Sequence, residues 1–329
     1  MLHLYLKELS KPIRATFLEK LQQRLLENHP KTLEIQQDLI RILAGYKGEK
    51  AVSYYLDFLP DKDFFIFHSL RLPSKNHFFQ IDFLLLTSRF ALILECKNFF
   101  GTLYFDESFK QLIRTANDKE EGFQDPLSQA KWHQQQLTNW LRSNGFNLPV
   151  DYYVVISNPS TIIKTSPQNK QALNKVVHGH SLLERIDEVN HTCKNPLYDE
   201  KTTRKISRLL LKRTTQESFD LLKKYGIKEE ELLTGVRCPA CGNIRMIHHY
   251  GTWKCPKCQL KCKDAHLESL KDYSFLVKPT ITNQEFRKFF HIHSPDVVNY
   301  LLKSMNLPHS GSTKGRVYYL NEEFRNFRA

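Results

Sequence analysis

The sequence predicts an α/β fold in which a mixed sheet is flanked by helices, with small modules following it. Short runs rich in Phe, Ile, Leu and Val indicate buried strands, at residues 64–70, 78–86, 90–96 and 151–157. A helical pattern lies between the last two runs, at 126–143, and Gly145 ends it. A sheet with a helix crossing over it is the arrangement that an α/β core requires.

The chain of 329 residues is long enough for several domains. We expect N-terminal helices at 1–44, which pack on an α/β domain at 45–200. A basic helical linker at 201–235, a four-cysteine module at 236–278 and a helical module at 279–329 follow. Within the α/β domain, weaker patterns predict strands at 101–105 and 109–113 and a short helix at 180–189.

The composition is basic, with 48 Lys and Arg against 35 Asp and Glu, a net charge of +13. Such a balance favours a polyanionic partner, either nucleic acid or an anionic membrane. No apolar run approaches the ~20 residues that span a bilayer, and the N-terminus lacks the pattern of a signal peptide. We therefore expect a cytoplasmic protein that does not bind membranes.

Two carboxylates and a lysine follow or interrupt the central strands. Asp82 lies inside the apolar run 78–86, and Glu95 and Lys97 close the next run, where alternation places both on one side. A Glu-x-Lys pair at a strand end is commonly a solvated edge pair, but a carboxylate in an apolar run costs several kcal/mol unless it is paired or metal-bound. Carboxylate oxygens are the ligands that Mg²⁺ prefers, and a lysine can stabilise developing negative charge. The pattern indicates a set of residues suited to hydrolysing a phosphodiester bond.

This pattern resembles the Asp…Glu-x-Lys core of the restriction-endonuclease-like nucleases and, more closely, the nuclease-related domain (NERD) family. Three further blocks carry the resemblance: Gly48-Glu49-Lys50-Ala51-Val52, Asn98-Phe99-Phe100-Gly101 and Asp125-Pro126-Leu127-Ser128-Gln129. It covers about residues 45–160, and the triad alone would be weak because such spacings occur by chance. The resemblance implies a restriction-endonuclease-like sheet and a nuclease that uses Mg²⁺ or Mn²⁺.

The resemblance also implies a role for each site residue. Asp82 and Glu95 would bind the catalytic cation, and Glu49 would complete or support its shell. Lys97 would activate the attacking water or stabilise the transition state, and Gln129 would orient Lys97 or the water. From the residues alone, Glu49 could equally be an acid near a helix start and Gln129 plain helix surface.

Four cysteines form a second signal. Cys238-Pro239-Ala240-Cys241 and Cys255-Pro256-Lys257-Cys258 are two Cys-x-x-Cys knuckles separated by thirteen residues. This spacing fits one structural Zn²⁺ held by Cys238, Cys241, Cys255 and Cys258, and it resembles a zinc ribbon. A redox role would need a single such pair at a helix start, so the sequence favours zinc.

The segments around the cysteines are basic and helical. Residues 201–224 predict one helix with eight cations against two acids, either a solvated face or a nucleic-acid contact. Thr282 and Ser294 each begin a predicted helix, and a basic turn with Lys314 and Arg316 leads into a strand. This order resembles a winged helix-turn-helix, with a small helical cap on the ribbon as the alternative. From residue 201 onward, 24 Lys and Arg face 12 Asp and Glu, so we expect this part to supply most of the affinity for nucleic acid.

The sequence thus predicts a metal-dependent nuclease, acting on DNA rather than RNA, with accessory nucleic-acid-binding modules. Two alternatives remain open. One is a non-catalytic nucleic-acid-binding protein that keeps the nuclease fold as a scaffold, and the other is a zinc-dependent module that docks another protein. Retention of all three residues of the Asp…Glu-x-Lys set favours the enzyme.

Overall fold

The computed structural model describes residues 5–60, 63–75, 77–217, 220–312, 315–320 and 324. The chain forms two compact units. The first comprises Met1–Lys11 and Arg41–Ser218, and the second comprises Pro12–Ile40 and Phe219–Ala329. The second unit is therefore built from two stretches of sequence that flank most of the first.

The first unit is organised around a six-stranded mixed sheet with the order β1-β2-β3-β4-β8-β10. Its strands are β1 (Tyr5–Lys7), β2 (Phe65–Ser74), β3 (His77–Leu86), β4 (Ala91–Lys97), β8 (Val150–Ile156) and β10 (Val176–His178). Strands β2, β3 and β4 are antiparallel neighbours, whereas β4, β8 and β10 run parallel to one another. The predicted mixed sheet is confirmed.

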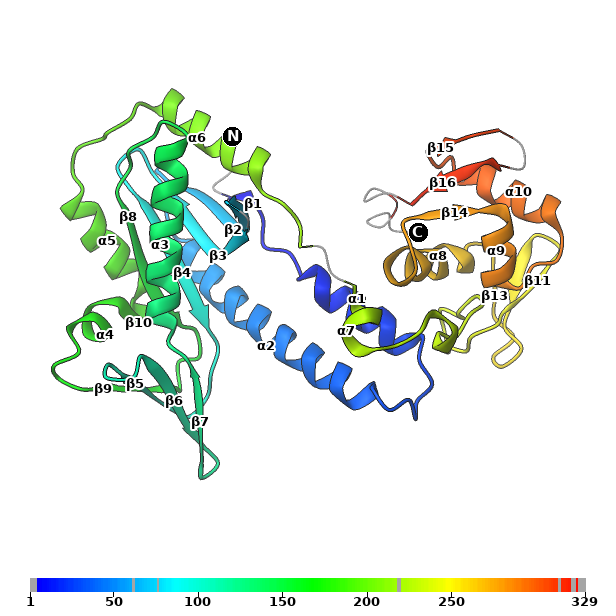
Figure 1. Cartoon of the computed structure of the whole chain (residues 1–329), viewed down its shortest axis with the longest axis horizontal. Helices are drawn as coiled ribbons and strands as arrows, with labels where there is room; N and C mark the ends of the chain where they lie inside the picture. Colours follow the sequence, from blue (N-terminus) through cyan, green and yellow to red (C-terminus); the bar gives the residue numbers. More distant parts are fainter. Residues whose placement is uncertain are drawn as a thin grey trace. The chain divides into compact units, whose positions relative to one another are not determined.

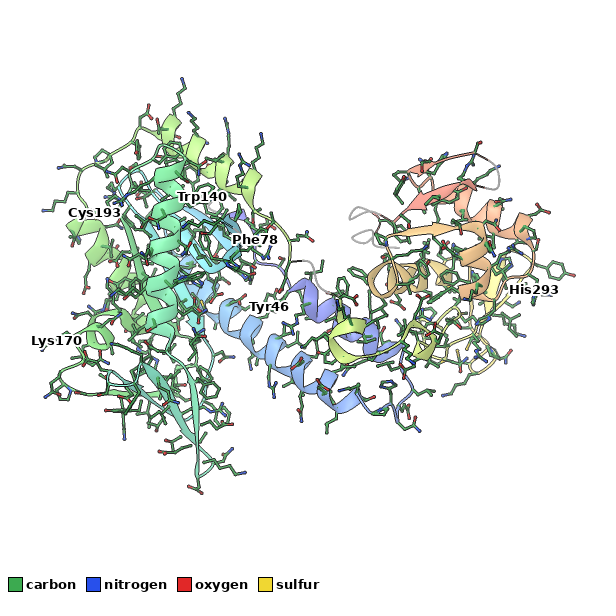
Figure 2. All side chains as sticks on the ribbon, in the orientation of Figure 1. Tyr46, Phe78, Trp140, Lys170, Cys193 and His293 are labelled. Atoms are coloured by element: carbon green, nitrogen blue, oxygen red, sulfur yellow. The ribbon has the colours of Figure 1, made fainter. Side chains whose placement is uncertain are left out.

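Each face of this sheet packs on helices (Figure 1). On one face, Ile93 and Val154 share a core with α3 (Pro126–Ser143) and α6 (Glu200–Arg213), and Trp140 of α3 belongs to it (Figure 2). On the other face, Leu92 and Leu94 pack with α5 (Leu182–Thr192) and with the end of α2 (Thr32–Leu56). The alternation of β4 between these two cores explains its unbroken apolar sequence.

A smaller four-stranded sheet, with the order β7-β6-β5-β9, accompanies the main sheet. It comprises β5 (Thr102–Asp106), β6 (Gln111–Ala116), β7 (Lys119–Gln124) and β9 (Ile162–Thr165), and α4 (Lys170–Lys175) and the short helix η1 (Gly179–Ser181) lie after it in the chain. β7 is largely exposed and reads Lys-Glu-Glu-Gly-Phe-Gln. Such a polar strand has no hydrophobic periodicity, which is why the sequence does not predict it.

The basic helix predicted at 201–224 is interrupted. α6 ends at Arg213, and the next helix, α7 (Leu221–Tyr225), lies in the second unit. Thr214 is extended, and the N–H of Thr215 donates to the carbonyl oxygen of Arg71 on β2 at 3.0 Å. The threonines thus continue along the sheet edge instead of the helix, so the single-helix prediction is wrong. Phe219, assigned to that helix, lies outside the described residues.

The N-terminal helices do not both pack on the α/β domain as expected. α1 (Ile13–Gln23) packs on α8 (Ala265–Leu276) in the second unit, where the rings of Phe17 and Phe275 are 4.7 Å apart. Asp272 explains the attachment. It is buried on α8 and accepts from Lys20 at 2.7 Å and from Nε of the buried Arg24 at 2.9 Å.

Replacing Asp272 by alanine should destabilise the second unit by roughly 3–5 kcal/mol, because it leaves the buried Arg24 charge without its partner. Chemical denaturation followed by far-UV circular dichroism measures the change. Glu268→Ala is the matched control, since Glu268 is half-exposed on the same helix and its ion pairs should contribute less than about 1 kcal/mol. Equal effects of the two changes would contradict a structural role for the buried pair.

Among the described residues, the rest of the second unit places two small sheets and the helices that follow them around one core. The first sheet, β11-β12-β13, comprises Ile247–His249, Thr252–Lys254 and Lys261–Cys262, after the short helix η2 (Glu229–Glu231). α8 is followed by β14 (Thr280–Thr282), α9 (Asn283–Phe290), α10 (Pro295–Ser304), β15 (His309–Ser310) and β16 (Val317–Tyr319). Thr282 caps α9 with a capping box and Ser294 caps α10, as the sequence predicts. Within the described ranges, no helix combines the length and apolar content needed to cross a bilayer.

Candidate active site and metal centre

The candidate active site forms where β3 and β4 separate. Their antiparallel pairing ends at Phe83 and Leu94, whereas β4 continues beside β8 up to the pair of Lys97 and Ile156. The N–H of Cys96 donates instead to Oδ2 of Asp82 at 2.8 Å. The Asp82 side chain therefore takes the place of a backbone partner and lies against β4.

An irregularity in β2 and β3 sets the position of Asp82. The ladder pairs His68 with Phe83 and Leu70 with Ile81, but not Ser69 with Asp82. Ser69 has a φ of +51°. Ile81 and Phe83 are two residues apart and would share a face in a regular strand, but their side chains enter opposite cores. Ile81 instead shares its core with Leu84. The strand alternation is thus reset at Asp82, which frees its carboxyl group from either apolar core.

Glu95 and Lys97 lie on the α3 face of β4. Glu95 is 1% exposed, and its Oε1 accepts from Lys97 Nζ at 2.7 Å. Lys97 Nζ also donates to Gln129 Oε1 on α3 at 3.1 Å. Glu95 Oε2 lies 3.3 Å from His133 Nδ1, in a geometry that leaves both buried atoms without a hydrogen bond among the described residues. One oxygen of the buried carboxylate is therefore available to a further ligand.

Glu49 reaches the site from α2, whose backbone at Gly48 lies close to the residues that follow β4 and β8. A Cβ added to Gly48 would lie 2.5 Å from Asn98 Cβ and 2.8 Å from Ser157 Oγ, and Asn98 Nδ2 donates to the Ala44 carbonyl oxygen at 2.7 Å. Glycine thus allows α2 to lie against the ends of β4 and β8. Glu49 Oε2 is 2.6 Å from His68 Nε2 on β2.

Replacing Gly48 by alanine should therefore destabilise the first unit by about 1–3 kcal/mol, the usual cost of overpacking. Gly45→Ala is the matched control on the same helix, because a Cβ there meets nothing within 4 Å. Alanine at that position should stabilise by up to about 1 kcal/mol through helix propensity. Thermal unfolding of both variants measures the difference, and a stabilised Gly48→Ala protein would contradict the close approach.

The charged groups of the site shift one another's pKa values. Burial and the neighbouring charges of Glu95 and Glu49 raise the pKa of Asp82 well above its usual range. Burial alone would raise the pKa of Glu95, but the nearby His133 and Lys97 lower it overall. Burial alone would lower the pKa of Lys97, but Glu95 and Asp82 raise it. Asp82 and Glu95 thus act on the Lys97 ammonium, and an added cation would stabilise the Asp82 carboxylate.

The donor set fits a hard divalent cation. The residues that would hold it are Asp82, with its raised pKa, and Glu95, whose Oε2 makes no hydrogen bond to the described residues. Among the described residues, these acids do not form a group of three or more ligand atoms close enough to share one ion, as the cysteines do. Mg²⁺ binds proteins through one or two carboxylates and keeps several waters.

Comparison with known families bears on residues 44–157, which match the model of the nuclease-related domain. This part of the chain is similar to the nuclease-related domain family. Its matched range begins on α2, ends just after β8, and contains Glu49, Asp82, Glu95, Lys97 and Gln129. No curated protein and no solved structure gives a significant match to the chain.

The structure adds two histidines to the candidate site that the sequence did not predict. His133 is buried beside Glu95, and His68 is buried beside Glu49. His133 follows Gln129 by four residues on α3, and this spacing places both on one helix face, so the signal was present. His68 carries no such signal, because its position depends on the irregularity at Ser69.

The four cysteines form the candidate metal centre of the second unit. Their Sγ atoms all lie within 4.8 Å of one another, and the pairs Cys238–Cys258 and Cys241–Cys255 are 3.6 Å apart. Four sulfurs at about 2.3 Å from one zinc ion would be about 3.8 Å apart. Amide groups of Cys258 and Lys257 lower the pKa of Cys255 to about 6. The cluster is thus suited to bind a metal such as zinc and is compatible with a zinc ribbon.

The two knuckles have equivalent backbones. The N–H of Cys238 donates to the carbonyl oxygen of Asn243, and the N–H of Cys255 donates to that of Leu260, at 2.8 Å and 2.9 Å. Gly242 and Gln259, each four residues after the first cysteine of its knuckle, have positive φ values of 71° and 62°. Two such turns facing each other bring four thiols to one point.

Proposed function

We propose that the chain is a nuclease that hydrolyses phosphodiester bonds in DNA with Mg²⁺ or Mn²⁺. The observation that supports this most is the convergence of Asp82, Glu95 and Lys97 where β3 and β4 separate, inside a nuclease-related domain. Asp82 and Glu95 would hold the cation, which supplies charge neutralisation at the phosphate and acidifies a bound water.

Lys97 is suited to stabilise charge rather than to remove a proton. Its raised pKa favours the protonated ammonium at neutral pH, which supports a role as a fixed positive charge. As an ammonium oriented by Glu95 and Gln129, it can donate to a non-bridging phosphate oxygen in the transition state. We assign Gln129 and Glu95 the positioning of this side chain, and Glu49 the support of Asp82 through the local charge.

The second unit would hold the substrate. We propose Zn²⁺ at the four cysteines and a winged helix-turn-helix in the order α8-β14-α9-α10-β15-β16, with the sheet order β14-β16-β15. A cavity of about 690 Å³ between α9, α10 and β16 supports a polyanionic ligand, because Arg287, Lys303 and Arg316 are the charged side chains among the described residues that line it. Lys314, expected to contact phosphate, lies outside the described residues.

The test is incubation of the purified chain with linear, circular and single-stranded DNA and with RNA, in the presence of Mg²⁺, Mn²⁺ or EDTA. Cleavage of DNA that requires the cation supports the proposal, and comparison of circular with linear DNA separates endonuclease from exonuclease. Binding without cleavage under every cation condition would favour a nucleic-acid-binding protein that keeps the fold as a scaffold.

A further inference from the structure

The sheet β11-β12-β13 of the second unit has one buried and one exposed face. Trp253 pairs with His248 on β11 and with Cys262 on β13, and these side chains face the core, where the Trp253 ring is 1% exposed. Its Nε1 donates to His266 Nδ1 of α8 at 3.1 Å. The next register row, formed by Ile247, Lys254 and Lys261, therefore lies on the outer face, where all three are exposed.

This outer row carries uncompensated positive charge. Lys254 and Lys261 are directly opposite each other, and like charges in this relation are destabilising. Neither lysine forms an ion pair with any of the described residues. From 237 to 263 the sequence has no acid and six cations, which are Arg237, Arg245, Lys254, Lys257, Lys261 and Lys263. An anionic partner would relieve the repulsion.

An exposed aromatic side chain is fixed at the tip of the same sheet. Tyr250 and Gly251 form the two-residue turn between His249 and Thr252, and both have positive φ values, of 44° and 74°. Such turns favour Asn or Asp before Gly, so a tyrosine there costs stability. The Tyr250 side chain is nonetheless 93% exposed, with its ring 4.1 Å from that of His249. A strained, solvated aromatic residue is an indication of function rather than of packing.

We propose that the outer face of β11-β12-β13 is a binding platform for single-stranded nucleic acid. Unpaired bases would stack on Tyr250 and His249, and Lys254 and Lys261 would contact two phosphates. A duplex is excluded from the stacking because its bases are already stacked on both faces. An acidic protein segment would satisfy the lysines but offers no flat ring for Tyr250. The inference rests on the proposed function only for the choice of a nucleic-acid ligand, and it does not require cleavage.

Fluorescence anisotropy tests the platform on the full chain carrying Asp82→Ala, so that no probe is cut. The probes are labelled oligo(dT) and oligo(U) of about 20 nucleotides, longer than one expected binding site, and a duplex of the same length. Tyr250→Asn is the decisive variant, because asparagine is favoured in this turn and should keep the ribbon folded. We expect it to weaken single-strand binding roughly tenfold and duplex binding by less than about twofold.

The lysines are tested through the salt dependence. Lys254→Ala/Lys261→Ala should lower the slope of log K against log salt by about 1.4, since each phosphate contact on a single strand contributes about 0.7. Lys110→Ala/Lys119→Ala removes two exposed lysines from the first unit and should leave the slope unchanged. Zinc content and Trp253 fluorescence report whether the ribbon remains folded.

Each outcome decides the inference. Unchanged single-strand affinity of the Tyr250→Asn protein would overturn it, as would equal competition by polyglutamate, which would make the face a docking site for acidic protein. If oligo(dT) and oligo(U) bind with similar affinity, the platform recognises nucleic acid through base stacking and phosphate contacts alone, as expected. A chain that binds single strands through this face but cuts no nucleic acid would support the platform and refute the proposed nuclease.

Discussion

Replacing Glu95 by glutamine should lower the rate of DNA cleavage by roughly 10²-fold or more, the scale of one preorganised electrostatic contribution. Glutamine keeps the shape of the buried side chain but removes the charge that holds Lys97 Nζ and would hold the cation. Asp82→Ala should have an effect of the same size, since it removes the other ligand. Initial rates at saturating Mg²⁺ or Mn²⁺ measure both.

A matched control distinguishes loss of a carboxylate in the candidate site from loss of a carboxylate elsewhere on the unit. Glu107→Gln removes an exposed acid from the turn before β6 in the same unit, and the rate should stay within about twofold of the unaltered protein. Far-UV spectra and melting temperatures confirm folding of all three variants. Cleavage at the full rate by the Glu95→Gln protein would remove this residue from the catalytic assignment.

Loss of the metal centre is the second large effect that we expect. Cys255→Ser should abolish stoichiometric zinc binding, about one ion per chain, and unfold the ribbon, because four thiolates define the tetrahedral site. Trp253 provides the signal, since it is fully buried beside the cysteines and would become exposed. Elemental analysis and the red shift of tryptophan emission measure the two changes.

Cys193→Ser is the control for loss of a thiol, because Cys193 follows α5 in the first unit, far along the sequence from the cluster. It should retain one zinc ion. Protection of the first unit against limited proteolysis should persist in the Cys255→Ser protein, since its core contains none of the four cysteines. Full zinc content after Cys255→Ser would refute the four-cysteine site.

Strongly periodic elements were predictable from the sequence. The apolar strands β3, β4 and β8 and the helix α3 follow their predicted ranges within a residue or two, because burial on both faces or on one helix face dictates their residues. The meeting of Lys97 with Gln129 follows from the same elements. The polar strand β7 and the reset of alternation at Asp82 could not be predicted, since tertiary pairing rather than composition determines them.

The distribution of charge also required the structure. α6 carries most of the cations assigned to the basic linker, yet Ile206 and Leu210 of this helix are buried in the core of the first unit. The first unit has 26 Lys and Arg against 20 Asp and Glu, and the second has 22 against 15. Both units are therefore basic, and a truncation after Glu200 would expose the hydrophobic core of the first unit, because it would remove α6.

The buried contact between Arg24 and Asp272 joins residues 248 positions apart in the chain. During synthesis, Arg24 leaves the ribosome long before its partner exists, and residues 41–218 can fold in the interval. Folding of that insert shortens the loop that must close before Arg24 meets Asp272. Assembly of the second unit should thus depend on prior folding of the first, and a carboxyl-terminal fragment made alone would lack the helix that neutralises Asp272.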